Sequence, residues 1–423
     1  MVKAMSMANP AGHRGAQQAS LRGHNLGLVA RTVAAAAEPP SRADLATATG
    51  LTRATVSRLV DALLEAQILA ELEPLNSQRA GRPAVPLVPA SGTFAAIGLE
   101  ANVDYIGGLV VDLAGNIITD RVVLGDHHDS DPADVLGQLG RLGNKLATIA
   151  GSRGAHVVGA GLAVPGLVDD DSTYLRVAPR LGWREVSPYP LLDVDGWLTD
   201  LGGLGLSAGN DAALAAVAET ALMKSVPPQD RTFLYVSGEI GVGAAIVVGG
   251  ELFRGRHGWS GELGHCLVDP SGPQCQCGAV GCLEVFAGTS AILQAAGLEI
   301  TGSALAGIPE LTELRLAAEA GEPRAVAAIE RAGRALGSAI GDAINLLDIT
   351  TVVLGNRYAD LADLLTPALA EGFASRALSA PWATPTITAS IAGDLPSLMG
   401  AAQQMTNAVL TDPLRWLEEP AMK

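Results

Sequence analysis

The chain has 423 residues, 48% of them hydrophobic and only 4% aromatic, so it can bury a core made mainly of aliphatic side chains. Its formal net charge of -16 argues against a protein that coats nucleic acid with its whole surface. The sequence has no apolar run of membrane-spanning length, and its N-terminus lacks the basic start, apolar core and cleavage site of a signal peptide. We therefore expect a cytoplasmic α/β protein that does not bind membranes.

Positive charge is concentrated at the N-terminus, where residues 1–60 carry seven Lys or Arg side chains against two acidic ones. Residues 1–20 are rich in Gly, Ala and Gln and show no apolar period, which predicts a flexible tail. From Leu21 onward apolar residues recur at helical spacing until Pro39 and Pro40, which cannot continue a helix. The first predicted helix therefore lies between them.

Two more helices joined by a tight turn are predicted next. Ser41 is a suitable N-cap, Gly50 allows the turn, and Val56, Leu59 and Leu63 give the second helix one apolar face. The side chains left outside at the start of that second helix are of the types that reach phosphates and base edges in a major groove. We expect DNA contacts from Thr52, Arg53, Thr55, Ser57 and Arg58.

Two short strands, expected at 68–73 and 85–88, enclose a loop that contains Arg79 and Arg82. Together with the preceding helices they predict a winged helix-turn-helix, an all-α or α+β DNA-binding domain over residues 21–90, with both arginines as further DNA contacts. The alternative is a three-helix fragment with a solvated basic face. Any single arginine here is expected at a phosphate more often than at a base.

The remainder of the chain, residues 91–423, repeats one plan of elements. Strands are expected at 94–100, 103–113, 116–124 and 156–164, with a helix at 132–150. A second set has strands at 232–236, 241–248, 251–253, 352–354 and 386–389, with helices near 324–347 and 360–370. Two strand-strand-strand-helix units suggest an actin-like or hexokinase-like architecture of two lobes with a ligand cleft between them.

Four metal-ligand side chains are clustered within the segment 261–284. One imidazole and three thiolates form a closed tetrahedral set for Zn²⁺, which suits a structural site because no position is left for water. The alternative is three buried thiols and a hydrogen-bonded histidine. Cys266 directly follows the histidine and is interpreted as a packing residue. The predicted zinc ligands are His265, Cys275, Cys277 and Cys282.

The same segment resembles a known family. Its pattern is Gly-Glu-Leu-Gly-His, then, ten residues after the histidine, Cys-x-Cys-Gly-x-x-Gly-Cys-Leu-Glu, and it is similar to that of the ROK family of repressors and sugar kinases. The stretches 163–169, 181–183, 209–213 and 353–355 agree, so the resemblance covers about residues 92–410. The N-terminal winged helix matches the repressor branch. The resemblance implies that residues 91–423 form a two-lobed ROK sugar-binding domain.

The resemblance also implies the sugar contacts. A carboxylate accepts hydrogen bonds from neighbouring sugar hydroxyls, and a zinc-bound imidazole keeps one ring N–H to donate. Asp211 has an alternative role as a helix-start residue, and the two glutamates could be solvated surface charges, although both flank the zinc ligands. The implied sugar ligands are Asn210, Asp211, Glu262, His265 and Glu284. The zinc would then orient these side chains as well as stabilise the fold.

The chain departs from the family's kinases at the nucleotide. Asp211 would be the base in a kinase, but residues 98–105 lack the glycines of the first phosphate loop. Glu239 stands where a kinase carries Thr, and a carboxylate beside a triphosphate is repulsive. Asn356 interrupts a Gly-Gly pair near the nucleotide base. We therefore expect no enzyme activity and no catalytic residue.

A further departure is Arg180, which stands where the family usually has Asn and would pair with an acidic or phosphorylated sugar or cover the cleft rim. The sequence as a whole predicts a transcriptional repressor that binds operator DNA and a monosaccharide or derivative, as a homodimer or homotetramer. One alternative is an ATP-dependent sugar kinase. Another is a signalling scaffold that binds a transport protein through the zinc-bearing lobe.

Overall fold

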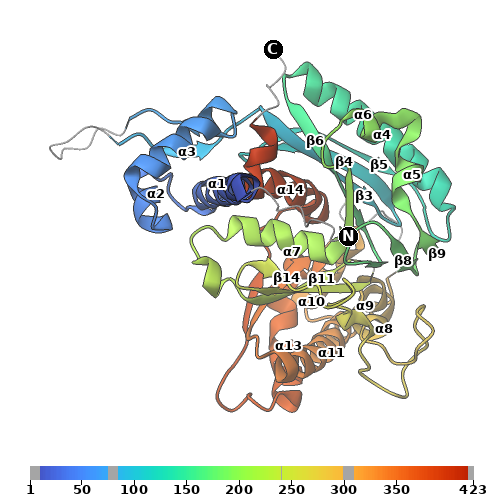
Figure 1. Ribbon diagram of the computed structural model, residues 1–423. Helices are drawn as coiled ribbons and strands as arrows, with labels where there is room; N and C mark the ends of the chain where they lie inside the picture. The colour runs from blue at the N-terminus through green and yellow to red at the C-terminus, as the bar shows by residue number, and fades with distance from the viewer. Residues whose placement is uncertain (1–9, 75–83, 240, 299–308, 418–423) are drawn as a thin grey trace, which may run out of the picture.

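The computed structural model describes residues 10–74, 84–239, 241–298 and 309–417. Three parts are visible in Figure 1: an N-terminal head at the left, an upper lobe and a lower lobe. The two lobes each contain a five-stranded mixed sheet, so the two-lobed α/β architecture expected from the repeated plan is confirmed. Within the described residues, no helix is both long and apolar enough to cross a membrane.

The head is a helix-turn-helix followed by a two-stranded sheet. Its helices are α1 (Pro10–Ala35), α2 (Arg42–Thr49) and α3 (Arg53–Glu65), and its strands are β1 (Leu69–Glu71) and β2 (Leu87–Pro89), which pair antiparallel. Ser41 caps α2 in a capping box with Asp44, and Gly50 ends it with a φ of 70°. Val56, Leu59 and Leu63 of α3 are buried as predicted. Arg79 and Arg82 lie outside the described residues.

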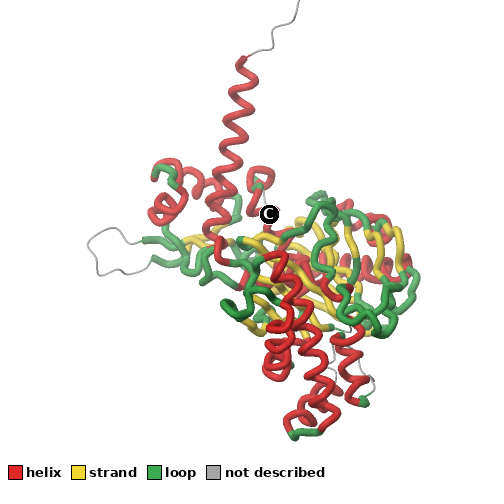
Figure 2. The backbone as a smooth tube through the Cα atoms, turned by 90° about the horizontal axis from the view of Figure 1, so that it is seen from below, coloured by secondary structure: helices red, strands yellow, loops and turns green. Residues whose placement is uncertain are grey.

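Helix α1 begins at Pro10, eleven residues before Leu21, where the first helix was expected to start. Figure 2 shows the N-terminal turns of this helix extending away from the rest of the molecule. Ala and Gln are good helix formers, and their frequency before Leu21 favours a helix that starts earlier than the apolar period indicates. The apolar period therefore marks the part of a helix that packs, and here the helix starts before that part.

The sheet of the upper lobe has the strand order β10-β6-β3-β4-β5. The strands are β3 (Phe94–Ala101), β4 (Tyr105–Asp112), β5 (Ile117–Leu124), β6 (His156–Val164) and β10 (Leu206–Asn210). Helix α4 (Pro132–Ser152) packs on one face, with Leu136 and Leu139 in one core with Ile97 and Leu99. Helix α14 (Pro396–Thr411) packs on the other face, where Gly98 lies directly against the backbone of Leu398.

The sheet of the lower lobe has the order β13-β12-β11-β14-β15. Its strands are β11 (Phe233–Gly238), β12 (Val242–Val248), β13 (Glu251–Leu252), β14 (Thr351–Asn356) and β15 (Thr386–Ala389). One face is covered by α11 (Pro323–Leu347) and α13 (Ala362–Arg376), and the other by α7 (Asp211–Leu222). Since α7 also packs extensively against α14, these two helices lie between the two sheets (Figure 1).

Several elements were not expected from the sequence. A three-stranded sheet extends the upper lobe, with β7 (Leu167–Val168), β8 (Leu175–Ala178) and β9 (Trp183–Val186). Strand β10 and helix α14 were also missed. The short helices that complete the described chain are α5 (Pro188–Leu192), α6 (Trp197–Asp200), α8 (Glu284–Ala287), α9 (Thr289–Ala296), α10 (Pro309–Glu319) and α12 (Arg357–Asp360).

The head shares a continuous core with the upper lobe. Leu26 and Val29 of α1 are buried in one cluster with Phe94 of β3, Val409 of α14 and Trp416 beyond it. A Cβ added at Gly27 would lie 2.3 Å from the carbonyl oxygen of Thr411, so the two helix backbones touch there. The head is therefore packed as part of the upper lobe.

Candidate functional site

A cavity of about 290 Å³ lies where the lobes meet, and it is lined by all five predicted sugar residues. Asn210 and Asp211 come from the junction of β10 and α7, Glu262 and His265 from the segment after β13, and Glu284 from the start of α8. The structure thus brings together residues that three separate motifs contribute. The cavity has the size of a small-molecule site, and its lining is rich in hydrogen-bonding groups.

The junction of β10 and α7 places two polar side chains at one helix start. Asn210 is the N-cap of α7, accepting from the Ala213 N–H at 3.1 Å and donating to the Gly166 carbonyl at 3.3 Å. Asp211 is the first residue of α7, and its Oδ1 lies 2.8 Å from the Ala212 N–H. Asp211 therefore starts the helix and also lines the cavity, so one position does not exclude the other.

The carboxyl group of Asp211 lies in an environment that disfavours its ionised form. Burial and the neighbouring charge of Glu239 raise the pKa of Asp211 to about 8. Burial raises the pKa of Glu239 and of Glu100 in the same way, and Glu239 contributes to the rise at Glu100. The three acids therefore influence one another, and burial favours the neutral form of each.

Glu239 is held by amides from both lobes. Its Oε2 accepts from Asn102 Nδ2 at 3.0 Å, and Asn102 belongs to the loop after β3 in the upper lobe. Its Oε1 accepts from Asn356 Nδ2 at 2.7 Å, and Asn356 ends β14 in the lower lobe. Asn356 also donates to Ser237 Oγ at 2.8 Å, and Asn102 to the buried Glu100 at 3.3 Å. The residues that depart from the kinase motifs thus hydrogen-bond to one another.

Glu284, another acid of the cavity lining, is paired with an arginine. Arg180 Nη2 lies 3.0 Å from Glu284 Oε1, with side-chain exposures of 19% and 12%. Arg180 therefore faces the cavity rather than solvent, and its partner is the protein's own carboxylate. Arg184 of β9 also lines the cavity and was missed from the sequence. Arg184 directly follows the buried Trp183 in the same strand. Because neighbouring strand residues face opposite sides, the position of Trp183 could have indicated that Arg184 points away from the core.

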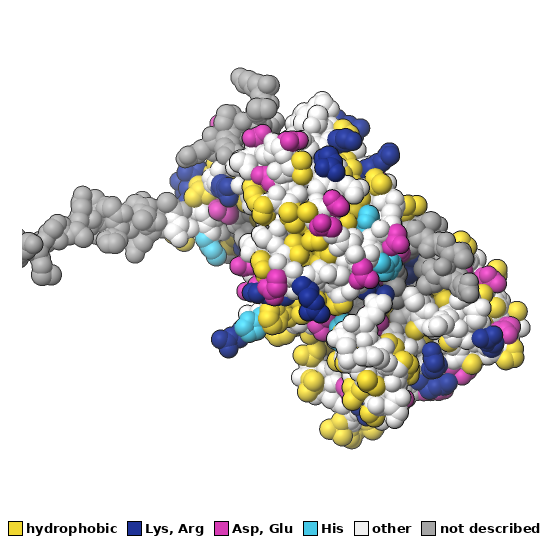
Figure 3. Space-filling view, turned by 90° about the vertical axis from the view of Figure 1, so that its right-hand side faces the viewer, with side chains coloured by type: hydrophobic (Ala, Val, Ile, Leu, Met, Phe, Trp, Pro, Cys, Tyr) yellow, Lys and Arg dark blue, Asp and Glu magenta, His cyan; other side chains and the backbone are white. Residues whose placement is uncertain are grey.

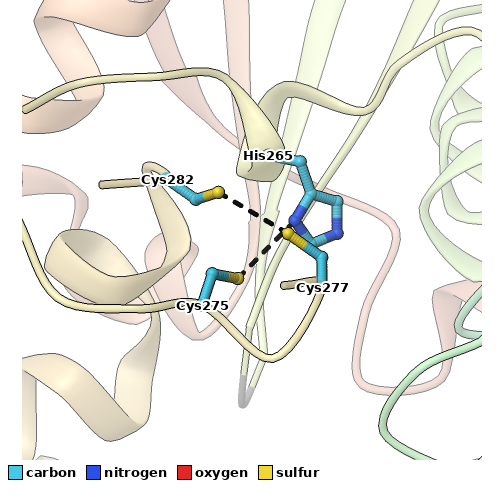
Figure 4. A group of neighbouring side chains, drawn as sticks. All are labelled: His265, Cys275, Cys277 and Cys282. Atoms are coloured by element: carbon cyan, nitrogen blue, oxygen red, sulfur yellow. Dashed lines mark hydrogen bonds between the residues drawn. The ribbon is translucent and has the colours of Figure 1, made fainter. Parts of the chain in front are cut away.

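The four predicted metal ligands form one cluster, shown in Figure 4. Their ligand atoms all lie within 4.8 Å of one another. Sulfur atoms about 2.3 Å from a tetrahedral Zn²⁺ lie roughly 3.8 Å apart. Cys277 Sγ and Cys282 Sγ are 3.7 Å apart, and Cys275 Sγ is 3.8 Å from His265 Nδ1. The donor set and its spacing fit one tetrahedral metal ion.

The two ring nitrogens of His265 face different groups. Nδ1 faces the thiol of Cys275, whereas Nε2 lies 3.8 Å from Glu262 Oε2 on the cavity side. An imidazole that gives Nδ1 to a metal keeps its proton on Nε2, which can then donate to a carboxylate or a ligand. The metal cluster and the cavity therefore share His265.

The backbone around the cluster depends on glycine. Gly281 has a φ of 73°, and a Cβ there would lie 1.7 Å from the Asp269 carbonyl oxygen. Next to this close approach, Cys282 forms an isolated antiparallel bridge with Leu267. Cys266 is not in the metal cluster, as expected, but it is exposed, so its interpretation as a packing residue is wrong.

Five predicted DNA contacts lie in the described part of the head. Thr52, Arg53 and Arg58 are exposed, and Thr55 and Ser57 are partly exposed at the start of α3. Thr52 is the N-cap of α3 and accepts from the Thr55 N–H at 3.2 Å, so its hydroxyl already stabilises the helix. Figure 3 shows the face at the right-hand side of Figure 1, on the side away from the head, and there acidic, basic and histidine side chains are mixed. An accessible helix start of this kind suits entry into a major groove.

Comparison with known proteins gives the family. The sequence profile described as "ROK family" matches residues 96–407. The xylose repressor of Caldicellulosiruptor bescii is 27% identical over 384 residues, covering 88% of this chain and 93% of that protein. The DNA-binding transcriptional dual regulator NagC of Escherichia coli is 28% identical over 81% of this chain and 82% of that protein. The xylose repressor of Bacillus subtilis is 30% identical, but the match spans only 64% of its length.

Solved structures extend the comparison to the fold. A ROK family transcriptional regulator described as a homolog of the E. coli MLC protein superposes with a TM-score of 0.73 and 25% identity, covering 94% of this chain and 99% of the other. A ROK glucokinase from Streptomyces griseus in complex with glucose and AMPPNP, at 24% identity and a TM-score of 0.59, covers 73% of this chain. The regulator therefore matches nearly the full chain and the kinase a smaller part. The chain belongs to the ROK family.

Proposed function

We propose that this protein is a sugar-responsive transcriptional repressor. The observation that carries the proposal is the combination in one chain of a helix-turn-helix head with a polar interlobe cavity, joined by a shared core. Relatives named as xylose repressors and as a DNA-binding regulator support it. The head would bind operator DNA through α3, with Arg79 and Arg82 as further contacts, and a monosaccharide or derivative would occupy the cavity.

The sugar would be held by the five residues that the family motifs imply. Asn210, Asp211, Glu262 and Glu284 offer acceptors for hydroxyl donors, and His265 Nε2 offers a donor. A ligand that binds one arrangement of the lobes better than another shifts the population toward it. Since the head packs on the upper lobe, a change in lobe arrangement would move the heads relative to each other in a dimer or tetramer. Two paired recognition helices bind an operator only when the spacing between them matches the spacing of its half-sites, so this movement would change operator binding.

Zinc is the metal that suits the cluster. His265, Cys275, Cys277 and Cys282 would hold it, and four protein ligands leave no coordination position for water, so its role would be structural. It would join the segment after β13 to the start of α8. This joining would set the positions of Glu262 and Glu284 on either side of the ligands.

We do not propose kinase activity. Glu239 places a carboxylate at the inner end of the cavity, and both of its oxygens are occupied by the amides of Asn102 and Asn356. The region that would need to attract a triphosphate is therefore acidic. A coupled assay of ADP release with candidate sugars should show no turnover, and sugar-dependent turnover lost in Asp211→Asn would establish the kinase instead.

The test of the proposal is an electrophoretic shift assay with DNA from upstream of the protein's own gene, with and without each sugar of a monosaccharide panel. We expect a specific complex whose amount changes with at least one sugar. Absence of a complex under every condition would refute the proposed function. Arg53→Ala should weaken the complex, since Arg53 is exposed at the start of α3, whereas Arg334→Ala, far from the head on α11, should not.

A further inference from the structure

The inner end of the cavity is closed by Glu239. Its carboxylate lines the cavity, and its oxygens accept from Asn102 at 3.0 Å and from Asn356 at 2.7 Å. These amides come from different lobes, so the carboxylate is positioned by the meeting of the lobes. Arg357 lies on the far side of Glu239, in a separate cavity of about 170 Å³, where it approaches Asp360 at 3.7 Å. Its charge is shared with that aspartate.

The charged groups of the cavity are unbalanced. Among the described lining residues, four carboxyl groups (Asp211, Glu239, Glu262 and Glu284) face two guanidinium groups, Arg180 and Arg184. Arg180 is already paired with Glu284 at 3.0 Å. Arg184 is exposed, on strand β9. The arginine that the sequence offered as a partner for an acidic sugar is thus committed to the protein. Arg357 and Arg180 both act on the charge of Glu239, but the lining still holds more carboxyl groups than guanidinium groups.

The inner end already disfavours its own negative charges. Burial and Glu239 together raise the pKa of Asp211 to about 8, so one more anion there meets the same repulsion. A phosphate group carries close to two negative charges near neutral pH. Repulsion between such a group and a carboxylate in a cleft is worth more than the tenfold affinity change that 1.4 kcal/mol represents. Hydroxyl groups, by contrast, donate to carboxylates without adding charge.

We infer that the effector is an unphosphorylated, uncharged sugar and that Glu239, held between Asn102 and Asn356, is the residue that excludes sugar phosphates and sugar acids. This inference rests on the proposed function, because it concerns the ligand of the same cavity. It also gives Arg180 a different role from that of an anion receptor. By pairing with Glu284 it restrains one acceptor and removes one uncompensated charge from the cavity wall.

The experiment is calorimetric titration of the full chain with matched pairs: xylose and xylose 5-phosphate, glucose and glucose 6-phosphate, N-acetylglucosamine and its 6-phosphate. We expect the free sugar of the responsive pair to bind at least about tenfold more tightly than its phosphate. In Glu239→Gln the ratio of the free sugar's affinity to that of its phosphate should fall at least about threefold, because the phosphate gains affinity. Glu185→Gln, the same change on an exposed residue of β9 outside the cavity lining, should leave the ratio unchanged.

The outcomes separate the inference from the function on which it rests. A sugar phosphate that binds the unaltered protein as tightly as its free sugar, or more tightly, overturns the inference while the sensor function stands. If that binding is lost in Arg184→Ala, the phosphate is held at the rim by Arg184. A ratio unchanged in Glu239→Gln overturns the role of Glu239. If no free or phosphorylated sugar binds, and operator affinity is the same with and without each of them, the proposed function fails and the inference fails with it.

Discussion

Arg180 and Glu284 form an ion pair across the cavity, with Nη2 and Oε1 3.0 Å apart and both side chains largely shielded from solvent. Arg180 follows strand β8 in the upper lobe, and Glu284 begins α8 beside the metal cluster in the lower lobe. The pair therefore links the small sheet to the segment that holds the metal ligands. Its separation from bulk water makes it stronger than a surface pair and more costly to break on one side.

Arg180→Ala should lower the free energy of unfolding by about 1 to 3 kcal/mol, because it leaves Glu284 shielded without a partner. Arg334→Ala is the matched control, since Arg334 pairs with Glu330 and Glu371 on an exposed helix surface and should cost less than about 1 kcal/mol. Urea denaturation of both variants measures the difference. Equal small losses would mean that the shielded pair contributes no more than a surface pair.

Cys275→Ser should release the metal, lower the melting temperature and reduce the sugar response. The thiol is one of four ligands, and its loss also frees His265, whose Nε2 faces the cavity. Metal content, thermal unfolding and sugar titration measure these effects. Cys266→Ser is the control and should keep the metal, because Cys266 lies outside the cluster. A Cys275→Ser protein that lost its metal but kept its full sugar response would limit the metal to a stabilising role.

Asp211→Asn should change the pH dependence of stability in a defined direction. Because the folded-state pKa of Asp211 is raised to about 8, the aspartate contributes its stability at low pH and loses it as pH rises toward 8. The asparagine variant should therefore match the parent protein near pH 4 and become the more stable of the two above pH 8. Guanidinium denaturation across this range measures it. A constant difference at every pH would contradict the raised pKa.

Gly400→Ala should destabilise the contact between α14 and α7, because the added Cβ would lie 1.7 Å from the Leu214 carbonyl oxygen. The expected cost is about 1 to 3 kcal/mol. Gly151→Ala is the control, since no neighbouring atom lies within 4 Å of its added Cβ near the end of α4. It should be neutral or stabilising by up to about 1 kcal/mol. The same free energy of unfolding for both variants would show that α14 and α7 can separate without loss.

The short-range features of this protein were predictable from its sequence. The metal cluster follows from ligand types spaced within one segment, and the helix-turn-helix from Ser41, Gly50 and one apolar face. Helix α14 was not predicted because residues such as Gly400, Ala401 and Ala402 are buried among several neighbours. With apolar or small residues on most sides, the helix shows no clear amphipathic period.

The inner end of the cavity could not be predicted in the same way. Glu239 and Asn102 are 137 positions apart, and only the approach of the two lobes brings them to 3.0 Å. The sequence showed that Glu239 is unfavourable for a triphosphate, but it gave no sign that two amides would hold it. The sequence left two roles open for Arg180, and it gave no sign of the ion pair with Glu284.

The central claim is that occupancy of the cavity changes binding of DNA by the head. Fluorescence anisotropy of labelled operator DNA, titrated with the protein in the absence and presence of a saturating sugar, tests it most directly. We expect the operator affinity to change at least about tenfold for the parent protein. Asp211→Asn should bind the operator equally well but show no response to the sugar. Identical operator affinity with and without a sugar that calorimetry shows to be bound would contradict the claim.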